Sequence, residues 1–384
     1  MKKKLLIISS SRADYDLIEP VFLNLRNYKT INSKILLTGS HYDKKFGYTF
    51  KDILKSGHKI DFSIKMNFNG LSKKKIIKNM SVYIRKLSFY LEKKKINIVL
   101  ILGDRYETIF SALVANFHNI CVAHISGGEV TEGSQDDCFR HAISKLSHIH
   151  FVSHNKYKKR LIQLGEKKTN IFNYGSLGLE NIHSIKFLKK QEIEKNFNIK
   201  FNKVNFLTTY HPETIDTKNN LKNLKILIDS LLHFDNTNIF ITSPNADFGS
   251  DEIINYIHKI KKKNKNIFFL KSLGKVKYFS LLHHCDLYLG NSSSGVTEVP
   301  HLKNYSINLG NRQQGRIYLN NVINIPFNKN KIINKIKELN KKKKFNFKSK
   351  KANSASKKIA KKISDINLNS YVPKKFIDLK NFIK

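Results

Sequence analysis

The sequence predicts an α/β protein with two lobes, each built around a parallel, doubly wound sheet. The chain has 384 residues, which is about right for two domains of ordinary size. Short apolar runs rich in Ile, Leu, Val and Phe alternate with longer amphipathic segments, and this alternation indicates parallel strands joined by helices. The alternation restarts after the segment YGSLGLENIHSIKFLKKQEIEK, so a second sheet is expected there.

The expected strands follow in order along the chain. Those of the first lobe are the runs at 4–9, 34–38, 97–102, 120–124, 149–153 and 170–174, and those of the second are the runs at 204–209, 238–242, 266–270, 286–290, 305–309 and 321–325. We place the first lobe at residues 1–180 and the second at 181–350. The lysine-rich remainder, 351–384, loses the strand pattern but keeps some helical apolar spacing, which predicts a C-terminal helical segment.

The positive charge of the chain is its most unusual bulk property. Lys and Arg number 70 against 29 Asp and Glu, a formal net charge of +41, which can indicate binding to nucleic acid or to an anionic membrane. The lysines are spread through every segment, however, together with many Asn and Ile. Such a spread is typical of an A+T-rich genome rather than of one binding face, so we expect no nucleic-acid partner.

The sequence favours a soluble protein of the cytoplasm. No apolar run approaches the roughly 18 residues that span a bilayer, and the start MKKKLLIISS has too short an apolar run for a secretion signal, so no membrane partner is expected. Cys121, Cys138 and Cys285 are scattered and lack CxxC spacing. This favours free thiols in a reducing compartment.

Nearly every polar motif follows one of the expected strands directly. In the first lobe these are SSSRADYD (9–16), TGSH (38–41), GDRYE (103–107) and HISGGEVTEG (124–133); in the second they are TYHPET (209–214), SPNADFGSDE (243–252), GNSSSGVTEVP (290–300) and GNRQQGR (310–316). Ligands of open α/β sheets bind outside the carboxyl ends of the strands. Two lobes with polar strand ends predict one cleft between them.

The motif GNSSSGVTEVP is the clearest phosphate signal. Ser292, Ser293 and Gly295 would present hydroxyl and backbone N–H donors at a helix start, although a serine that merely caps the helix is the plainer alternative. Glu298, one turn on, either complements the helix dipole or accepts hydrogen bonds from a ribose. Arginine is scarce in this lysine-rich chain, so those within motifs are expected to bind phosphate or carboxylate: Arg12, Arg105, Arg140, Arg312 and Arg316.

Acidic residues gather in the stretch HISGGEVTEGSQDDCFRH, residues 124–141. Glu129 and Glu132 lie on a glycine-containing loop, and Asp136 and Arg140 are spaced i, i+4 on one face of the helix that follows. A surface ion pair is the simple alternative for these last two. Asp104 follows another strand. Carboxylates on two sides of one site are what proton transfer on both faces of a sugar would need.

Histidine and amide candidates stand at other strand ends. His211 precedes a proline that would fix its turn, and His41 has a similar position, although a lone histidine is more often structural. Asn245 lies in SPNADFGSDE. No HExxH motif and no His/Cys cluster occurs, so no metal is expected. Neither GxGxxG nor GxxxxGK[ST] occurs, so neither a dinucleotide site nor a P-loop is expected.

Taken in order, the motifs GDRYE, HISGGEVTEG with DDCFRHAISKLSHIH, HPET, SPNADFGSDE, GNSSSGVTEVP and GNRQQGR resemble the hydrolysing UDP-N-acetylglucosamine 2-epimerase family, over residues 4 to about 330. This resemblance implies two Rossmann-like lobes in the glycosyltransferase-B arrangement, a C-terminal helix that returns to the first lobe, no cofactor and a homodimer. It also implies a reaction that converts UDP-GlcNAc and water to N-acetylmannosamine and UDP, through elimination across C1 and C2 and then hydration, in the synthesis of sialic-acid-type surface glycans.

The resemblance also implies roles for individual residues. Ser292 and Ser293 would hold the diphosphate and Glu298 the ribose, while Arg12, Arg105 and Arg312 would lie near phosphate or sugar. Asp104 and Asp136 match carboxylates that transfer protons, and His211 matches a histidine close to the leaving phosphate.

One position departs from the commoner pattern of the family. Many members read HIEGGE where this chain has HISGGE, so Ser126 stands in place of a glutamate. Others read HIHGGE, a branch that includes enzymes acting on UDP-GlcNAc and enzymes of the legionaminic-acid route. Either Glu129 or Glu132 then takes over acid-base work, or the substrate differs. UDP-2,4-diacetamido-2,4,6-trideoxyglucose, or a GDP analogue, is the alternative to UDP-GlcNAc.

Overall fold

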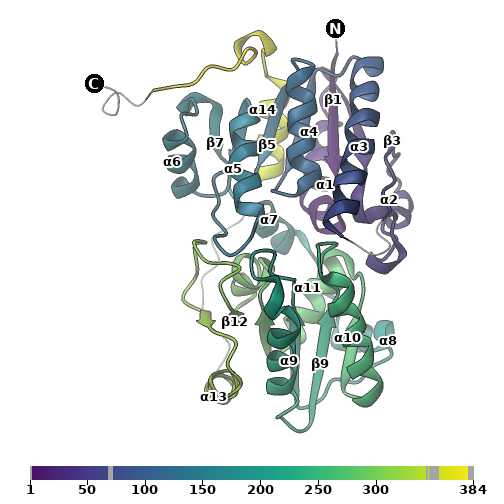
Figure 1. Ribbon diagram of the computed structural model, residues 1–384, viewed down its shortest axis with the longest axis vertical. Helices are drawn as coiled ribbons and strands as arrows, with labels where there is room; N and C mark the ends of the chain where they lie inside the picture. Colours follow the sequence, from purple (N-terminus) through teal and green to yellow (C-terminus); the bar gives the residue numbers. More distant parts are fainter. Residues whose placement is uncertain (1, 68–71, 343–344, 346–353, 379–384) are drawn as a thin grey trace.

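The computed structural model describes residues 2–67, 72–342, 345 and 354–378, and it contains two α/β lobes, one above the other in Figure 1. The sheet of the first lobe has the strand order β3-β2-β1-β4-β5-β6-β7, and that of the second has the order β10-β9-β8-β11-β12-β13. Every neighbouring pair is parallel. In both sheets the order reverses beside the first strand of the lobe, which is the doubly wound pattern.

All twelve predicted runs form strands, and one further strand, β3, has only two residues, too few to show a pattern in the sequence. The strands are β1 (Lys3–Ser9), β2 (Ile31–Leu37), β3 (Phe62–Ser63), β4 (Ile98–Leu102), β5 (Cys121–Ile125), β6 (Ile149–Val152), β7 (Ile171–Asn173), β8 (Val204–Thr209), β9 (Thr237–Thr242), β10 (Ile267–Leu270), β11 (Leu287–Gly290), β12 (Tyr305–Leu309) and β13 (Val322–Ile325). The predicted α/β class is therefore confirmed.

Helices connect the strands and cover both faces of each sheet, as Figure 1 shows. They are α1 (Arg12–Leu25), α2 (Phe50–Lys55), α3 (Lys73–Lys94), α4 (Tyr106–Phe117), α5 (Asp136–Leu146), α6 (Asn155–Gln163), α7 (Leu177–Ser184), α8 (Lys190–Phe197), α9 (Asn220–Leu231), α10 (Ser250–Lys263), α11 (Gly274–His284), α12 (Ser294–Thr297), α13 (Lys329–Asn340) and α14 (Ala355–Ser364). No described helix is both long and apolar enough to cross a bilayer.

Alternate side chains of β1 point to opposite faces of the sheet, so residues of this one strand pack in two separate hydrophobic cores. Leu5 and Ile7 pack on one side with residues of α1 and α14, whereas Leu6 and Ile8 pack on the other side with residues of α3 and α4. Successive side chains of a strand point to opposite faces, so a continuous apolar run such as this one forms a strand that is buried on both faces.

Helix α7 lies between the two lobes, and the predicted boundary at residue 180 falls inside it. Leu177 packs in the core of the first lobe, while Ile182 packs in the core of the second. The predicted boundary at residue 350 lies outside the described residues, as do 351–353 and 379–384 of the predicted C-terminal segment.

The C-terminal segment lies along the first lobe. Ile359 and Ile363 of α14 are buried in the core beside α1. Further on, Lys374 Nζ donates hydrogen bonds to the carbonyls of Ser147 (2.5 Å) and Lys145 (2.6 Å) at the end of α5. A cation at this position also complements the negative end of the helix dipole.

The buried carboxylate of Glu166 holds this C-terminal contact together. Its oxygens lie 2.7 Å from Lys374 Nζ, 3.0 Å from Lys145 Nζ and 3.0 Å from His150 Nε2. Burial alone would raise the pKa of Glu166, but the hydrogen bonds from His150 and Lys374 outweigh burial and lower the pKa from 4.5 to about 2.

Replacing Glu166 by glutamine is expected to lower the free energy of unfolding at neutral pH by about 3 kcal/mol. The pKa is lower in the folded state than in the unfolded state, so this contribution is complete above about pH 4.5 and disappears as the pH falls to about 2. The stability gap between wild type and variant should therefore close in acid, which urea unfolding at several pH values would measure. Glu338→Gln is the control: Glu338 also pairs with two lysines but lies exposed on α13, so little change is expected. An equal loss in both variants would contradict the explanation.

Candidate active site

Two adjoining cavities form a cleft at the carboxyl ends of the strands of both lobes. The first cavity has a volume of about 230 Å³ and the second about 290 Å³. They share the lining residues Ser11, Ala13, Leu17, His211, Asn245, Ser293 and Glu298. The cleft that the strand-end motifs predicted is therefore present, and it is lined from both lobes.

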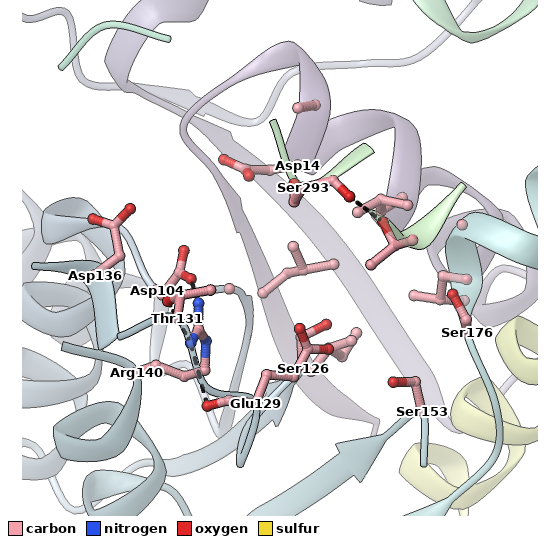
Figure 2. Close-up of a pocket in the computed structure, with 18 of the residues that line it drawn as sticks. Asp14, Asp104, Ser126, Glu129, Thr131, Asp136, Arg140, Ser153, Ser176 and Ser293 are labelled. Atoms are coloured by element: carbon pink, nitrogen blue, oxygen red, sulfur yellow. Dashed lines mark hydrogen bonds and ion pairs between the residues drawn. The ribbon is translucent and has the colours of Figure 1, made fainter. Parts of the chain in front are cut away.

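Arg140 organises the acidic wall of the first cavity. Its guanidinium, which is buried, forms an ion pair with Asp104 and donates hydrogen bonds to Thr131 Oγ1 (3.0 Å), Asp137 Oδ1 (3.2 Å) and the carbonyl of Glu129 (3.2 Å). Figure 2 shows Asp104, Thr131 and Glu129 gathered around it. One side chain of α5 thereby ties together the end of β4 and the loop after β5.

The simple i, i+4 surface pair between Asp136 and Arg140 is not what forms. Arg140 is 1% exposed and turns toward Asp104, whereas Asp136, at the first turn of α5, points toward the second lobe. Asp136 Oδ2 lies 4.0 Å from Arg312 Nη2. The two side chains take different partners because Asp136, at the start of α5, faces the cleft, whereas Arg140, one turn later, packs against the strand ends.

A second carboxylate, that of Asp247 in the second lobe, acts electrostatically on Asp136. Burial raises the pKa of Asp136, the negative charge of Asp247 raises it further, and Arg312 opposes both effects. Asp247 itself pairs with Arg105, with 3.4 Å between Oδ1 and Nη1. Asp247 was not singled out from the sequence, although its place at a strand end in SPNADFGSDE was the signal that could have found it.

The two glutamates of the loop after β5 have different surroundings. Glu129 lines the first cavity and forms an ion pair with Arg316 of the second lobe. Glu132 is exposed and does not line either cavity; its backbone N–H donates to the carbonyl of Gln314 at 3.0 Å. The structure therefore brings Glu129 to the cleft and leaves Glu132 outside it.

His211 lines both cavities as a neutral hydrogen-bond donor. Its Nδ1 accepts from the backbone N–H of Asn245 (3.0 Å), so in a neutral ring the proton is on Nε2, and no described residue accepts from that atom. Burial, with Arg312 and Arg105 nearby, holds the pKa of His211 well below its usual 6.5. Asn291 fixes the backbone here, because its Oδ1 accepts from the N–H of His211 (2.7 Å).

His41, the other histidine candidate, lies in the core of the first lobe instead. Its Nε2 is bonded to Ser9 Oγ (2.9 Å) and its Nδ1 to Thr49 Oγ1 (2.8 Å). Burial lowers its pKa to about 3. With both ring nitrogens occupied and no exposed surface, His41 does not line either cavity.

The second cavity holds the serine motif and Arg12. Ser292, Ser293 and Asn245 line it, and Arg12 reaches it beside Asp16, with 2.9 Å between Nε and Oδ1. Gly295 does not line it. A Cβ at position 295 would lie 2.4 Å from the ring of Tyr288, so this glycine allows the helix that follows the serines to pack closely on the sheet.

Four of the arginines leave a buried nitrogen without a hydrogen-bond partner among the described residues. These atoms are Arg12 Nη1, Arg105 Nη2, Arg312 Nε and Arg316 Nε. All four residues line the cleft. Buried donors are nearly always satisfied in a folded protein, so this cluster indicates a polyanionic ligand. Within the described residues, no group of three or more His, Cys, Asp or Glu is arranged to hold a metal.

Glu298 lies where the two cavities adjoin. It lines both cavities, and its Oε1 would lie 2.6 Å from a Cβ at Gly178 of α7. Burial raises its pKa, while hydrogen bonds from Thr297 and Ser294 oppose that effect. The cleft thus combines guanidinium groups, hydroxyls and carboxylates. Together with the two Rossmann-like sheets, it defines the class of glycosyltransferase-B architectures.

Comparison with known proteins identifies the family within this class. A model of the UDP-N-acetylglucosamine 2-epimerase family matches residues 23–365, and the chain belongs to this family. A Campylobacter jejuni relative named GDP/UDP-N,N'-diacetylbacillosamine 2-epimerase (hydrolyzing) is 38% identical over 98% of this chain and 100% of its own length. The polysialic acid biosynthesis protein P7 of Escherichia coli is 37% identical over 86% of this chain and 84% of its own.

Solved structures confirm the predicted architecture. The UDP-GlcNAc 2-epimerase of Methanocaldococcus jannaschii, in complex with UDP-GlcNAc and UDP, matches with a TM-score of 0.76 and 21% identity, over 94% of this chain and 99% of that one. The enzyme of Neisseria meningitidis bound to UDP-GlcNAc also has a TM-score of 0.76, with 19% identity, over 94% of this chain and 99% of that one. At these identities the likeness establishes the fold alone.

Proposed function

We propose that this protein is a hydrolysing 2-epimerase of a UDP-linked 2-acetamido sugar. The observation that carries the proposal is that one cleft holds both anion-binding donors and acids. Arg105, Arg312 and Arg316 line the first cavity together with the carboxylates of Asp104, Glu129 and Asp136. Arg12 and the serines line the second cavity, and His211 lines both. UDP-GlcNAc, with N-acetylmannosamine and UDP as products, is the substrate that the motifs imply.

The reaction needs both the donors and the acids of such a cleft. A base removes the proton from C2, the bond from C1 to the phosphate oxygen breaks, and UDP leaves with the electron pair. Water then adds, with its oxygen to C1 and a proton to C2 from the other face. Donors placed around the departing diphosphate stabilise the charge that builds up in the transition state, and carboxylates serve as the acid and the base.

The surroundings of the acids suggest their roles. Asp104 is our candidate for the base, because it lines the cavity beside Arg140 and is partly open to it. Asp136 is our candidate for the group that carries a proton, because burial and Asp247 raise its pKa. Glu129 is paired with Arg316 and is the candidate to orient the sugar. Glu132, outside the cavity, has no role in this proposal.

His211→Ala is expected to lower kcat by about 100-fold to 1,000-fold, because one donor to the departing phosphate is lost. His211→Gln, which keeps an N–H donor, should recover part of the rate. Since the pKa of His211 lies well below 6.5, the rate of the wild-type enzyme should show no change above about pH 6 that comes from protonation of this imidazole. Steady-state UDP release at several pH values would measure both effects. A change in rate near pH 6.5 that is present in wild type and absent in His211→Ala would contradict the role of His211 as a neutral donor.

The test of the function is incubation with UDP-GlcNAc in heavy water, followed by NMR. Release of UDP with N-acetylmannosamine that carries deuterium at C2 is the expected result. A glycosyltransferase of the same architecture would leave the C2 hydrogen in place. UDP-2,4-diacetamido-2,4,6-trideoxyglucose is the second substrate to test, since the Campylobacter jejuni relative is named for this sugar. No release of UDP from either compound would overturn the proposal.

A further inference from the structure

Asp247 is an acid of the second lobe to which the reaction scheme above gives no role. It lies in the loop between β9 and α10 and lines neither cavity. Its side chain is only 12% exposed, and it pairs across the boundary between the lobes with Arg105, which follows β4 of the first lobe. Burial of a carboxylate costs free energy unless it is paired, so the contact with Arg105 is what stabilises Asp247 at this place.

Three groups enclose the guanidinium of Arg105. Its Nε lies 3.2 Å from Oε2 of the buried Glu107, its Nη1 lies 3.4 Å from Oδ1 of Asp247, and its central carbon lies 5.4 Å from the centre of the Tyr106 ring. Glu107 and Tyr106 follow Arg105 directly in the chain, whereas Asp247 comes from the other lobe. Without Asp247 the guanidinium would have an ion pair at Nε alone, so its outer nitrogens are fixed when the lobes are together.

The remaining nitrogen of Arg105 is available to a ligand. Nη2 is buried and has no hydrogen-bond partner among the described residues, and Arg105 lines the first cavity. The nitrogens of a guanidinium lie in one rigid plane. The contacts at Nε and Nη1 therefore also set the direction in which Nη2 points.

The charge of Asp247 also acts on Asp136, which lines the first cavity. Asp136 faces Arg105 of its own lobe and Arg312 of the second lobe, with 4.0 Å between its Oδ2 and Arg312 Nη2. Both arginines and a hydrogen bond from Ser134 favour the ionised carboxylate, whereas Asp247 opposes them and raises the pKa of Asp136. Asp247 thus contacts one residue of the cavity and changes the charge state of another.

We propose that Asp247 is a positioning residue for the reaction, which fixes the guanidinium of Arg105 and supplies the negative charge that keeps a proton on Asp136. This inference rests on the proposed function, in which Asp136 carries a proton. Because Asp247 belongs to the second lobe, both effects need the two lobes to be together. Closure of the cleft then aligns an anion-binding donor and prepares the acid at the same time.

Asp251, four residues further along the chain, is the matched control. It also pairs across the boundary between the lobes, with 3.0 Å between its Oδ1 and Lys45 Nζ of the first lobe. Like Asp247, it lines neither cavity. A lost contact between the lobes would therefore affect variants at both positions, whereas the positioning role belongs to Asp247 alone.

The first experiment follows the protonation of Asp136 directly and needs no turnover. Protein with 13C in the carboxylates of its aspartates is titrated by NMR, and the resonance that is lost in Asp136→Asn identifies Asp136. Asp247→Asn keeps an oxygen for Arg105 but removes the charge, so the titration midpoint of Asp136 should move to lower pH. Asp247→Glu and Asp251→Asn should keep the wild-type midpoint. The same midpoint in Asp247→Asn as in wild type overturns the inference.

The second experiment measures kcat for UDP release against pH, with the compound that wild type turns over. If Asp136 has to carry a proton, kcat falls as the pH rises through its pKa, and this fall should occur at lower pH in Asp247→Asn. Asp247→Ala also removes the acceptor for Arg105 and is expected to lower kcat by about tenfold to 100-fold at its own optimum pH, as misplacement of a group in a site does. Asp251→Ala should stay within about twofold of wild type. Equal losses in the two alanine variants, with equal thermal midpoints, contradict the positioning role.

Failure of the inference and failure of the proposed function give different results. If wild type releases UDP while neither the midpoint of Asp136 nor the pH profile changes in Asp247→Asn, the function stands and Asp247 has no positioning role. If the midpoint moves as expected but wild type releases UDP from neither compound, the electrostatic link between the lobes is right and the reaction is wrong.

Discussion

Asp104→Asn is expected to lower the rate of UDP release by about 1,000-fold or more while leaving the fold intact. Loss of a general base typically costs about 100-fold to 10,000-fold, and Asp104 is our candidate for the base at C2. Asparagine has nearly the same shape and still offers an oxygen to Arg140, so the buried guanidinium keeps a partner. Steady-state kinetics of UDP release, together with the thermal midpoint of the variant, would measure both parts of the expectation.

Glu132→Gln is the matched control for this prediction. It removes a carboxylate from the acid-rich stretch 124–141, but Glu132 is exposed and lies outside both cavities. Its activity should stay within about twofold of wild type, as for most exposed positions away from a site. An inactive Glu132→Gln beside an active Asp104→Asn would reverse the assignment of the base.

Arg140→Met is expected to lower the free energy of unfolding by about 3–5 kcal/mol, the usual result of removing one partner of a buried ion pair. The change removes the guanidinium that donates to the carboxylates of Asp104 and Asp137, the hydroxyl of Thr131 and the carbonyl of Glu129. The loop after β5 should also lose its anchor, so activity should fall with stability. Urea unfolding monitored by circular dichroism would measure the loss.

Two further variants are controls for the prediction on Arg140→Met. Arg140→Lys keeps the charge but lacks the planar fork that reaches several acceptors at once, so its stability should lie between those of Met and wild type. Arg85→Met makes the same change at an exposed position on α3 and should shift the stability by less than about 0.5 kcal/mol. If Arg140→Met unfolds at the same urea concentration as Arg85→Met, the four contacts do not carry the stability assigned to them.

The sequence was most informative about features that depend on short segments of the chain. The apolar runs predicted all twelve of the longer strands. Most of these strands are buried on both faces, and such a strand has to be apolar throughout. The two-residue strand β3 was missed, since its pairing with β2 depends on neighbours rather than on its own residues. The serines after β11 line the second cavity, because the carboxyl ends of parallel strands meet at one edge of the sheet.

The individual side chains of the site were harder to predict. His41 and His211 both follow strands, yet the ring of His41 is enclosed by Ser9 and Thr49, whereas that of His211 keeps one nitrogen open to the cleft. Glu129 and Glu132 are three residues apart on one loop, and only Glu129 faces the cavity. Asp247 lines neither cavity, but it pairs with Arg105 and its charge raises the pKa of Asp136, because the fold brings the two lobes together here.

The sequence by itself determined the fold class, the two-lobed organisation and the edge of each sheet at which the polar motifs gather. These depend on hydrophobic periodicity and on the direction of parallel strands, which are properties of short segments. Only the tertiary structure decided which acids face the cleft and which histidine keeps a free nitrogen. Those features depend on contacts between segments that are far apart in the chain, such as Arg140 with Asp104 and Arg316 with Glu129, and such contacts leave no periodic signal in the sequence.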